Sequence, residues 1–353
     1  MGRSSGVVVL VAVVAGMLLC VAEAQTQLKP GYYDQTCKDA EAIVFDEVRK
    51  AWNADRSVPA ALLRLHFHDC FVNVYTQKLS LFSVVDRSPH SYADRPRRLC
   101  GLLVRVQGCD GSVLLESWDR QAEKDAPPNK SLRGYEVIDR AKARLEMACR
   151  QTVSCADILA YAARDSVKVA TGGFHYAVPG GRPDGTVSRA TMANSNLPPP
   201  TQRNVDLLAQ AFINKGLSKD DLIVLSGAHT LGVTRCGTFD YRLSNSNDKG
   251  MDPWFLNSLR AQCNRDASRV VPLDDGSQFA FDTKYYANVI ANRGVLESDA
   301  ALNSPSTVAR VRQLRDGTPQ TFHGAFAAAM GRMGALRGAN PGKVRDHCRR
   351  VRT

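Results

Sequence analysis

Residues 57–72 read SVPAALLRLHFHDCFV, and the fold can be built outward from this stretch. The run of alanine and leucine predicts a helix, with Ser57 as its cap and Pro59 in its first turn. Residues four apart share one face of a helix, so Arg64 and His68 are expected to project into one cavity. His66, only two residues from His68, is expected to point elsewhere.

The pairing of Arg64 with His68 suits proton transfer. A neutral imidazole can take and return a proton, and a fixed cation beside it stabilises developing negative charge. The spacing alone leaves two other interpretations open. In one, the histidine is bonded in the core and the arginine is paired at the surface. In the other, His66, His68 and Asp69 bind zinc in a metal hydrolase, although neighbouring helical positions do not converge easily on one ion.

A second histidine motif lies at residues 225–232, which read LSGAHTLG. Small residues flank His229 near the end of an apolar stretch, and such neighbours let a flat, bulky ligand approach the backbone. A buried histidine there would suit haem iron if a carboxylate held its other ring nitrogen. Asp299, in the sequence GVLESD at 294–299, is the candidate carboxylate. The spacing does not show whether the two side chains meet.

Helical periodicity recurs along the chain and strand signals are few, so the expected fold class is mainly α. Further helices are predicted at 39–54, 134–149, 155–170, 205–215, 220–229, 254–262, 282–292 and 308–333. The proline-rich stretch 197–200 is short enough for a loop between helices.

The first 24 residues have the pattern of a secretory signal peptide, with an apolar run too short for a membrane anchor and small residues at Ala22 and Ala24. Cleavage after Ala24 would remove Cys20 and leave nine of the ten cysteines, so pairing in an oxidising compartment would leave one over. The formal net charge of +11 accompanies no readable nucleic-acid module. We expect an anionic polysaccharide as partner, and a basic surface that only aids solubility is the alternative.

Three motifs in this order resemble those of class III secretory plant peroxidases, the horseradish peroxidase family. They are RLHFHDCFV at 64–72, VSCAD at 153–157 and LSGAHTLG at 225–232. The resemblance runs from about Gln25 to Arg349, apart from one inserted segment. It implies the plant haem peroxidase fold, in which distal and proximal helical lobes sandwich a b-type haem.

The resemblance also implies a role for each candidate site residue. His229 would be the proximal haem ligand and Asp299 its hydrogen-bond partner, while Arg64 and His68 would form the distal catalytic pair. Asn129 would hold His68 in the tautomer that leaves its other nitrogen basic. The implied reaction is the reduction of hydrogen peroxide, followed by oxidation of phenolic donors in one-electron steps.

Donor, calcium and disulfide sites are implied by the same resemblance. Pro179 would contact the phenolic donor. Two calcium sites are implied, a distal one at Asp69, Val72, Gly108, Asp110 and Ser112 with Glu123 nearby, and a proximal one at Thr230, Asp274, Ser277, Ala280 and Asp282. The cysteines would pair as Cys37 with Cys149, Cys70 with Cys109, Cys155 with Cys348 and Cys236 with Cys263, leaving Cys100 unpaired.

The inserted segment is Val74 to Gln107, 34 residues where the family would continue directly from Asn73 to Gly108. Long structureless loops inside compact domains are uncommon. Valine codons begin GT and a glutamine codon can be CAG, so a retained in-frame intron or an equivalent gene-model error is the favoured explanation, with an evolved functional loop as the alternative. The insert lengthens the loop that Cys70 and Cys109 must close and separates Val72 from Gly108.

Two functional hypotheses follow for residues 25–353. The first is an active secreted haem peroxidase with two calcium ions, acting in the extracellular space or the cell wall in the response to oxidative stress. The second is a cell-wall-binding homologue whose catalysis is impaired by the insert. We expect a monomer that acts on hydrogen peroxide and small phenolic donors and meets neither nucleic acid nor membrane.

Overall fold

The computed structural model describes residues 28–72, 75–76, 105–106, 108–244, 250–336 and 342–351. The predicted signal peptide and most of the insert, with Cys100, lie outside the described residues. Within the described part the chain is mostly helical with four short strands, which confirms the predicted fold class. None of the described helices is both long and apolar enough to cross a membrane.

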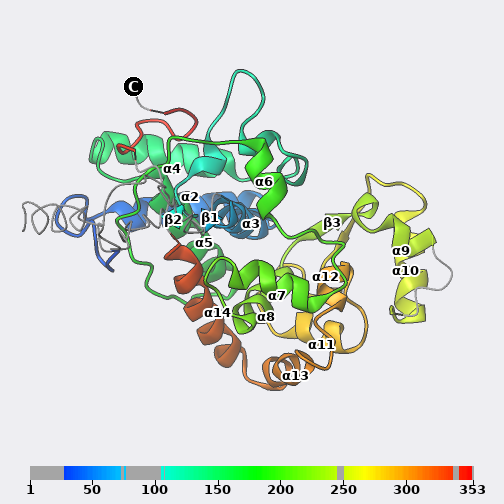
Figure 1. The fold of residues 1–353 in the computed structure, drawn as a ribbon. Coiled ribbons are helices and arrows are strands. Elements are labelled where there is room, and N and C mark those ends of the chain that lie inside the picture. The colour runs from blue at the N-terminus through cyan, green and yellow to red at the C-terminus, as the bar shows by residue number, and fades with distance from the viewer. Residues whose placement is uncertain are drawn as a thin grey trace, which may run out of the picture.

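One group of helices, in the upper part of Figure 1, packs around the helix that carries the first histidine motif. It comprises α2 (Ala40–Ala54), α3 (Val58–Phe71), α4 (Tyr135–Ala148), α5 (Cys155–Ala170) and α6 (Ala190–Asn196). Helix α3 lies against α5, and Leu62, Leu65 and Ile158 belong to the core between them. The side chain of Ser154 caps α5 by accepting a hydrogen bond of 3.1 Å from the amide of Asp157.

A second group lies below it in Figure 1 and carries the second histidine motif. It comprises α7 (Val205–Ile213), α8 (Lys219–Ser226), α11 (Lys284–Ile290), α12 (Glu297–Ala300), α13 (Val308–Asp316) and α14 (Pro319–Gly334). Helix α8 ends at Ser226, and a 3-10 turn, η4 (Gly227–Thr230), follows it and holds His229. The segment predicted as one helix over 220–229 therefore changes from an α-helix to a 3-10 turn two residues before His229.

Smaller elements connect these groups. Strands β3 (Val233–Arg235) and β4 (Val270–Pro272) pair antiparallel beside α9 (Asp240–Ser244), α10 (Pro253–Cys263) and η5 (Cys236–Thr238). The 3-10 turns η1 (Ser112–Leu114), η2 (Glu123–Asp125) and η3 (Pro127–Asn129) follow the insert. Strands β1 (Tyr75–Thr76) and β2 (Arg105–Val106) also pair antiparallel, so the two ends of the insert lie side by side.

All four predicted disulfides are present. They join Cys37 to Cys149, Cys70 to Cys109, Cys155 to Cys348 and Cys236 to Cys263. The Cys70–Cys109 bridge forms across a sequence separation of 39 residues, so the insert does not prevent it. The bridge between Cys155 and Cys348 ties the C-terminal segment to the first residue of α5.

Two sequence predictions are wrong in detail. The single helix predicted over 308–333 is two helices, because Gly317 ends α13 and Pro319 begins α14 behind the capping side chain of Thr318. Ser57 precedes α3 as predicted but does not cap it. Its hydroxyl donates to Oδ1 of Asp55 at 2.7 Å and makes no capping hydrogen bond to the helix.

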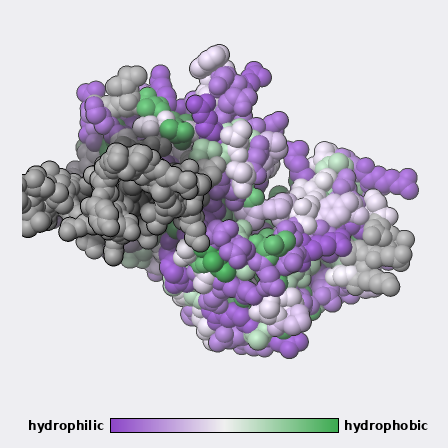
Figure 2. Space-filling view, viewed as in Figure 1, coloured by the Kyte–Doolittle hydropathy of each residue, from purple (hydrophilic) through white to green (hydrophobic). Residues whose placement is uncertain are grey.

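The described part of the surface in Figure 2 is mostly hydrophilic, with small, separate hydrophobic patches. The large apolar side chains instead gather in the cores of the two helical groups, which meet where α14 and η4 contact α3. This meeting place is where the two histidine motifs come together.

Candidate active site

Arg64 and His68 lie one turn apart on helix α3. His68 is buried and Arg64 is exposed. The guanidinium of Arg64 is fixed by hydrogen bonds to the carbonyl of Pro128 at 2.8 Å and to the hydroxyl of Ser131 at 2.9 Å. Both partners come from the segment around η3, so that segment orients the arginine.

Asn129, at the end of η3, sets the tautomer of His68. Its Oδ1 lies 2.6 Å from Nδ1 of His68, while its Nδ2 donates to the carbonyl of Glu123 at 2.8 Å. The second bond fixes which end of the amide faces the ring, so Nδ1 of His68 must carry the hydrogen. Nε2 of His68 is then an acceptor.

The electrostatic surroundings keep His68 neutral. Burial and, to a smaller extent, the charge of Arg64 lower its pKa to about 3, and the hydrogen bond to Asn129 opposes both effects only in part. A ring that is unprotonated at neutral pH and has a free Nε2 can accept a proton from a bound molecule.

His229 is held in a similar way by a carboxylate. Its Nδ1 lies 2.8 Å from Oδ1 of Asp299, which comes from the short helix α12 and is 1% exposed. Burial tends to lower the pKa of His229, but the charge and hydrogen bond of Asp299 outweigh it and raise the pKa, against a smaller opposing effect of Arg64. The predicted pair therefore meets.

The residues around His229 fit a haem group. The side chain of His229 is 36% exposed although Gly227 and Thr230, in the same turn, are buried. Because Nδ1 is bonded to Asp299, the accessible nitrogen is Nε2, the atom that a proximal ligand uses. Asp299 has no lysine or arginine partner among the described residues, so a cation bound to His229 would balance its buried charge.

The predicted distal calcium ligands cluster at the end of α3. Asp69 accepts from the amides of Gly111 at 2.9 Å and Val113 at 3.3 Å, and Asp110 accepts from that of Ser112 at 3.0 Å. Burial raises the pKa of Asp69, and the charge of Asp110 raises it further. Two buried carboxylates that repel each other fit a divalent cation.

The backbone at this site has little spare room. Val72 and Gly108 are buried, as are Ser112 and Glu123. A β-carbon on Gly108 would lie 2.1 Å from the carbonyl oxygen of Cys70, so only glycine fits there. The distal segment therefore closes tightly despite the insert.

The five predicted proximal calcium ligands also come together. Oγ1 of Thr230 lies 2.9 Å from Asp274, 3.2 Å from the carbonyl of Ala280 and 3.3 Å from Asp282. Ser277 donates to Asp274 at 3.0 Å, so the hydroxyl keeps the contact. The pKa of Asp274 is raised to about 6, because burial outweighs the hydrogen bonds from Thr230 and Ser277, which lower it. A set of carboxylate, hydroxyl and carbonyl oxygens fits calcium.

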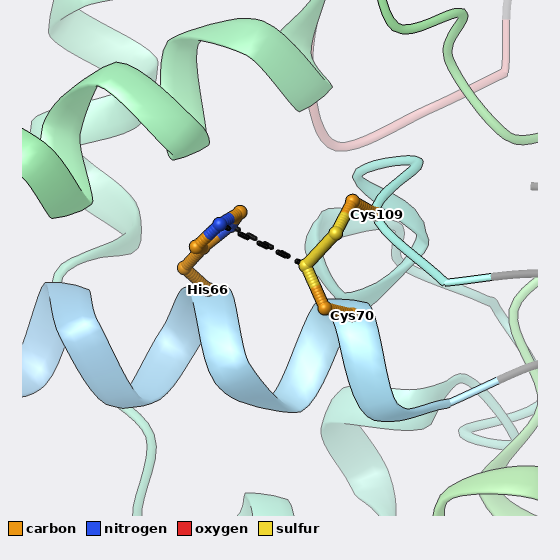
Figure 3. Close-up of side chains that lie close together, drawn as sticks. All are labelled: His66, Cys70 and Cys109. Atoms are coloured by element: carbon orange, nitrogen blue, oxygen red, sulfur yellow. Dashed lines mark hydrogen bonds between the residues drawn. A yellow bond between two sulfur atoms is a disulfide. The ribbon is translucent and has the colours of Figure 1, made fainter. Parts of the chain in front are cut away.

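His66 takes no part in this site. Figure 3 shows its ring on α3 pointing toward the Cys70–Cys109 disulfide, and both ring nitrogens lie 3.7 Å from Sγ of Cys70. Although His66 lies close to both sulfur atoms, oxidised cysteines are not thiolate ligands. The contacts of His66 and His68 diverge, which argues against the zinc hydrolase hypothesis.

Among the described residues, no hydrogen bond joins Pro179 to Arg64 or His68. The carbonyl of Pro179 accepts a hydrogen bond of 2.6 Å from Arg182. A shallow cavity beside it is lined by residues that include His66, Tyr176 and Met330, and neither Arg64 nor His68 lines that cavity. The contact with a phenolic donor remains a prediction.

Comparison with known proteins agrees with this geometry. A family model described as Peroxidase matches residues 44–316, and the chain belongs to that family. It is 43% identical to Peroxidase 5 of Vitis vinifera over 347 residues, which cover 94% of each chain. It is 39% identical to Peroxidase 30 of Arabidopsis thaliana over 353 residues, 97% of this chain and 95% of the relative. Peroxidase N1 of Nicotiana tabacum is 41% identical over 332 residues, 90% of this chain and 88% of the relative.

The chain is thus a haem peroxidase, an oxidoreductase that uses hydrogen peroxide, and the resemblance to class III plant peroxidases is confirmed. The catalytically impaired alternative is not favoured, because beside the insert His68 keeps its hydrogen bond with Asn129 and Arg64 is held by Ser131. Sequence reasoning missed Tyr285, whose hydroxyl donates to Asp299 at 2.9 Å, and the two partners of Arg64. No spacing or motif signals these contacts.

Proposed function

We propose that this peroxidase holds haem b between His68 and His229 and oxidises phenolic donors outside the cell. One relationship carries the proposal. Each imidazole has its Nδ1 held by a carbonyl or carboxylate oxygen, from Asn129 or Asp299, which leaves each Nε2 available. The charge of Arg64 also acts on both rings, which supports their facing a shared space.

Nε2 of His229 would hold the haem iron, and the haem would supply the redox chemistry for the reduction of hydrogen peroxide. The chain supplies the proton transfer. Nε2 of His68 accepts a proton from one oxygen of hydrogen peroxide and returns it to the other oxygen, which leaves as water. Arg64 stabilises the negative charge that develops as the O–O bond breaks, and Asn129 keeps His68 in the tautomer that can accept.

The remaining assignments extend this proposal. Phenolic donors would give up single electrons near Pro179. Calcium would occupy the distal and proximal oxygen clusters and hold the segments that follow His68 and His229 in place. Since Asp69 directly follows His68 and Thr230 directly follows His229, each ion would stabilise the position of one catalytic histidine.

We further propose secretion after cleavage at Ala24, a monomeric state and binding of the +11 chain to anionic cell-wall polysaccharide. The homology to plant peroxidases over nearly the whole chain supports secretion. Val74 to Gln107 are proposed to be a retained intron or a gene-model error.

The test is haem reconstitution of the protein with and without residues 74–107, followed by turnover with hydrogen peroxide and guaiacol. The proposal expects a Soret band and turnover in both forms. A Soret band without turnover in the full chain would reject an active enzyme for this form, and no Soret band in either form would reject haem binding itself.

A further inference from the structure

Two hydrogen-bond donors share a single oxygen of the carboxylate beside His229. Oδ1 of Asp299 accepts from Nδ1 of His229 at 2.8 Å and from the hydroxyl of Tyr285 at 2.9 Å. The other oxygen, Oδ2, is buried and has no hydrogen-bond partner among the described residues. Both donors therefore share one acceptor oxygen, while the second oxygen contributes to neither bond.

Sharing an acceptor weakens each bond. A hydrogen bond from Tyr285 withdraws negative charge from Oδ1, so the oxygen attracts the proton on Nδ1 of His229 less strongly. Burial enlarges this effect, because Asp299 is 1% exposed and Tyr285 is 2% exposed, and little water screens them.

Neighbouring rings fix the position of the Tyr285 ring. It lies edge-on to the ring of His229, with centroids 6.1 Å apart and an interplanar angle of 83°. The ring of Tyr286 is also close to it, with centroids 5.1 Å apart and an interplanar angle of 70°. These ring contacts and the burial of Tyr285 restrict the direction in which its hydroxyl can donate, so the bond to Asp299 is a built contact between α11, α12 and η4.

We propose that Tyr285 is a positioning residue that moderates the hydrogen bond between Asp299 and His229 and thereby sets how basic His229 is as a haem ligand. This inference rests on the proposed role of His229 as proximal ligand. A strong bond to a carboxylate gives the imidazole more anionic character, which strengthens its bond to iron and favours the ferric state. The hydrogen bond from Tyr285 keeps the anionic character of the His229 imidazole below the level that Asp299 alone would give.

The neighbouring tyrosine provides a matched control. Tyr286 is equally buried, but its hydroxyl donates to the carbonyls of Ile223 and Val224 at 3.2 Å each and does not reach Asp299. Tyr285→Phe and Tyr286→Phe each remove one buried hydroxyl from the same helix, so a general loss of packing affects both variants alike.

The experiment compares the haem-reconstituted wild-type protein with these two variants. Resonance Raman spectra of the ferrous protein report the stretching frequency of the iron–histidine bond, and spectroelectrochemistry reports the ferric/ferrous midpoint potential. Tyr285→Phe is expected to raise the frequency and lower the potential. Tyr286→Phe is expected to leave both where the wild-type protein has them.

A third variant covers the case in which Tyr285→Phe fails to fold or to take up haem. Site-specific 3-fluorotyrosine at position 285 keeps the ring and makes its hydroxyl a stronger donor, so it should lower the frequency and raise the potential. An unchanged frequency in the fluorinated protein, or equal shifts in Tyr285→Phe and Tyr286→Phe, would overturn the inference. A wild-type protein without an iron–histidine band would instead reject the proposed role of His229.

Discussion

Asn129 Oδ1 lies 2.6 Å from His68 Nδ1, and the same amide donates to the carbonyl of Glu123, so a flip of the amide would lose both bonds. We expect Asn129→Leu to slow the reaction with hydrogen peroxide by about tenfold to a hundredfold, because His68 loses the partner that selects its tautomer. Stopped-flow absorbance of the haem band measures this rate. Asn257→Ala, at an exposed position on α10, is the control, and equal rates in both variants would contradict the assignment.

His229→Ala should bind haem at least about a hundredfold more weakly, because no other residue is proposed to ligate the iron. Haem titration followed at the Soret band measures the affinity, and far-ultraviolet circular dichroism checks that the helices remain. His175, which is exposed, supplies the control variant His175→Ala. If His229→Ala bound haem as tightly as the control, the proximal ligand would have to be another residue.

Removing calcium should destabilise the protein. Chelation would leave Asp69 and Asp110 buried beside each other without a cation, and Asp274 would be in a similar position in the other cluster. A site filled at a hundred times its dissociation constant contributes about 2.7 kcal/mol to the free energy of unfolding. The thermal midpoint should therefore fall by several degrees in chelator and recover when calcium, but not magnesium, is added.

Calcium content separates the two sites. Atomic emission should find about two calcium ions per purified chain, and Asp274→Asn should lower the content by about one ion because Thr230 and Ser277 then face a neutral side chain. A wild-type protein that contains no calcium, with a thermal midpoint insensitive to chelator, would refute both sites.

Deleting residues 74–107 should leave the protein folded, since strands β1 and β2 already bring the two ends of the segment together. The deletion reduces the separation of Cys70 and Cys109 from 39 residues to 5 (39 − 34), a change whose effect on loop-closure entropy grows only logarithmically. Thermal unfolding and thiol titration measure the outcome. A free thiol pair in the shortened protein would show that the bridge requires the insert.

Sequencing the transcript across Val72 to Gly108 tests the origin of the segment. A spliced message without these codons is the expected result, and a message that always retains them would establish an evolved loop.

Lys215 should make the free energy of unfolding depend on pH in the alkaline range. Its side chain is buried, and burial lowers its pKa to about 8 from 10.5. Between these values the unfolded chain holds a proton that the folded chain has released, so the free energy of unfolding rises with pH across this window. Relative to Lys215→Met, the gain should reach at most about 3.5 kcal/mol, which is 2.5 pKa units at about 1.4 kcal/mol per unit. Urea unfolding from pH 7.5 to 10 measures it, and a difference that stays flat would contradict the lowered pKa.

Periodicity and local spacing predicted the parts of the fold that depend on neighbouring residues. The positions of Arg64, His66 and His68 on α3 follow from helical geometry alone, and the structure places their side chains accordingly. The meeting of His229 with Asp299, 70 residues later, could not be derived from spacing and came from the family resemblance.

Other misses have different physical causes. Apolar residues at helical spacing lie on both sides of residues 315–321, and periodicity alone joined them into one helix, although Gly317 ends the first helix and Pro319 begins the second. A buried tyrosine usually finds a partner for its hydroxyl, but the adjacent Tyr285 and Tyr286 are identical residues whose partners lie in different helices. Only the tertiary packing distinguishes them.

The antiparallel pairing of Tyr75 with Val106 and of Thr76 with Arg105 brings the two ends of the segment between them together. Whatever is joined there begins and ends at nearly the same place, so its length puts little tension on the catalytic body. The β1–β2 pair is therefore a suitable insertion point for a foreign domain whose ends lie close together, such as a fluorescent reporter or a wall-binding module.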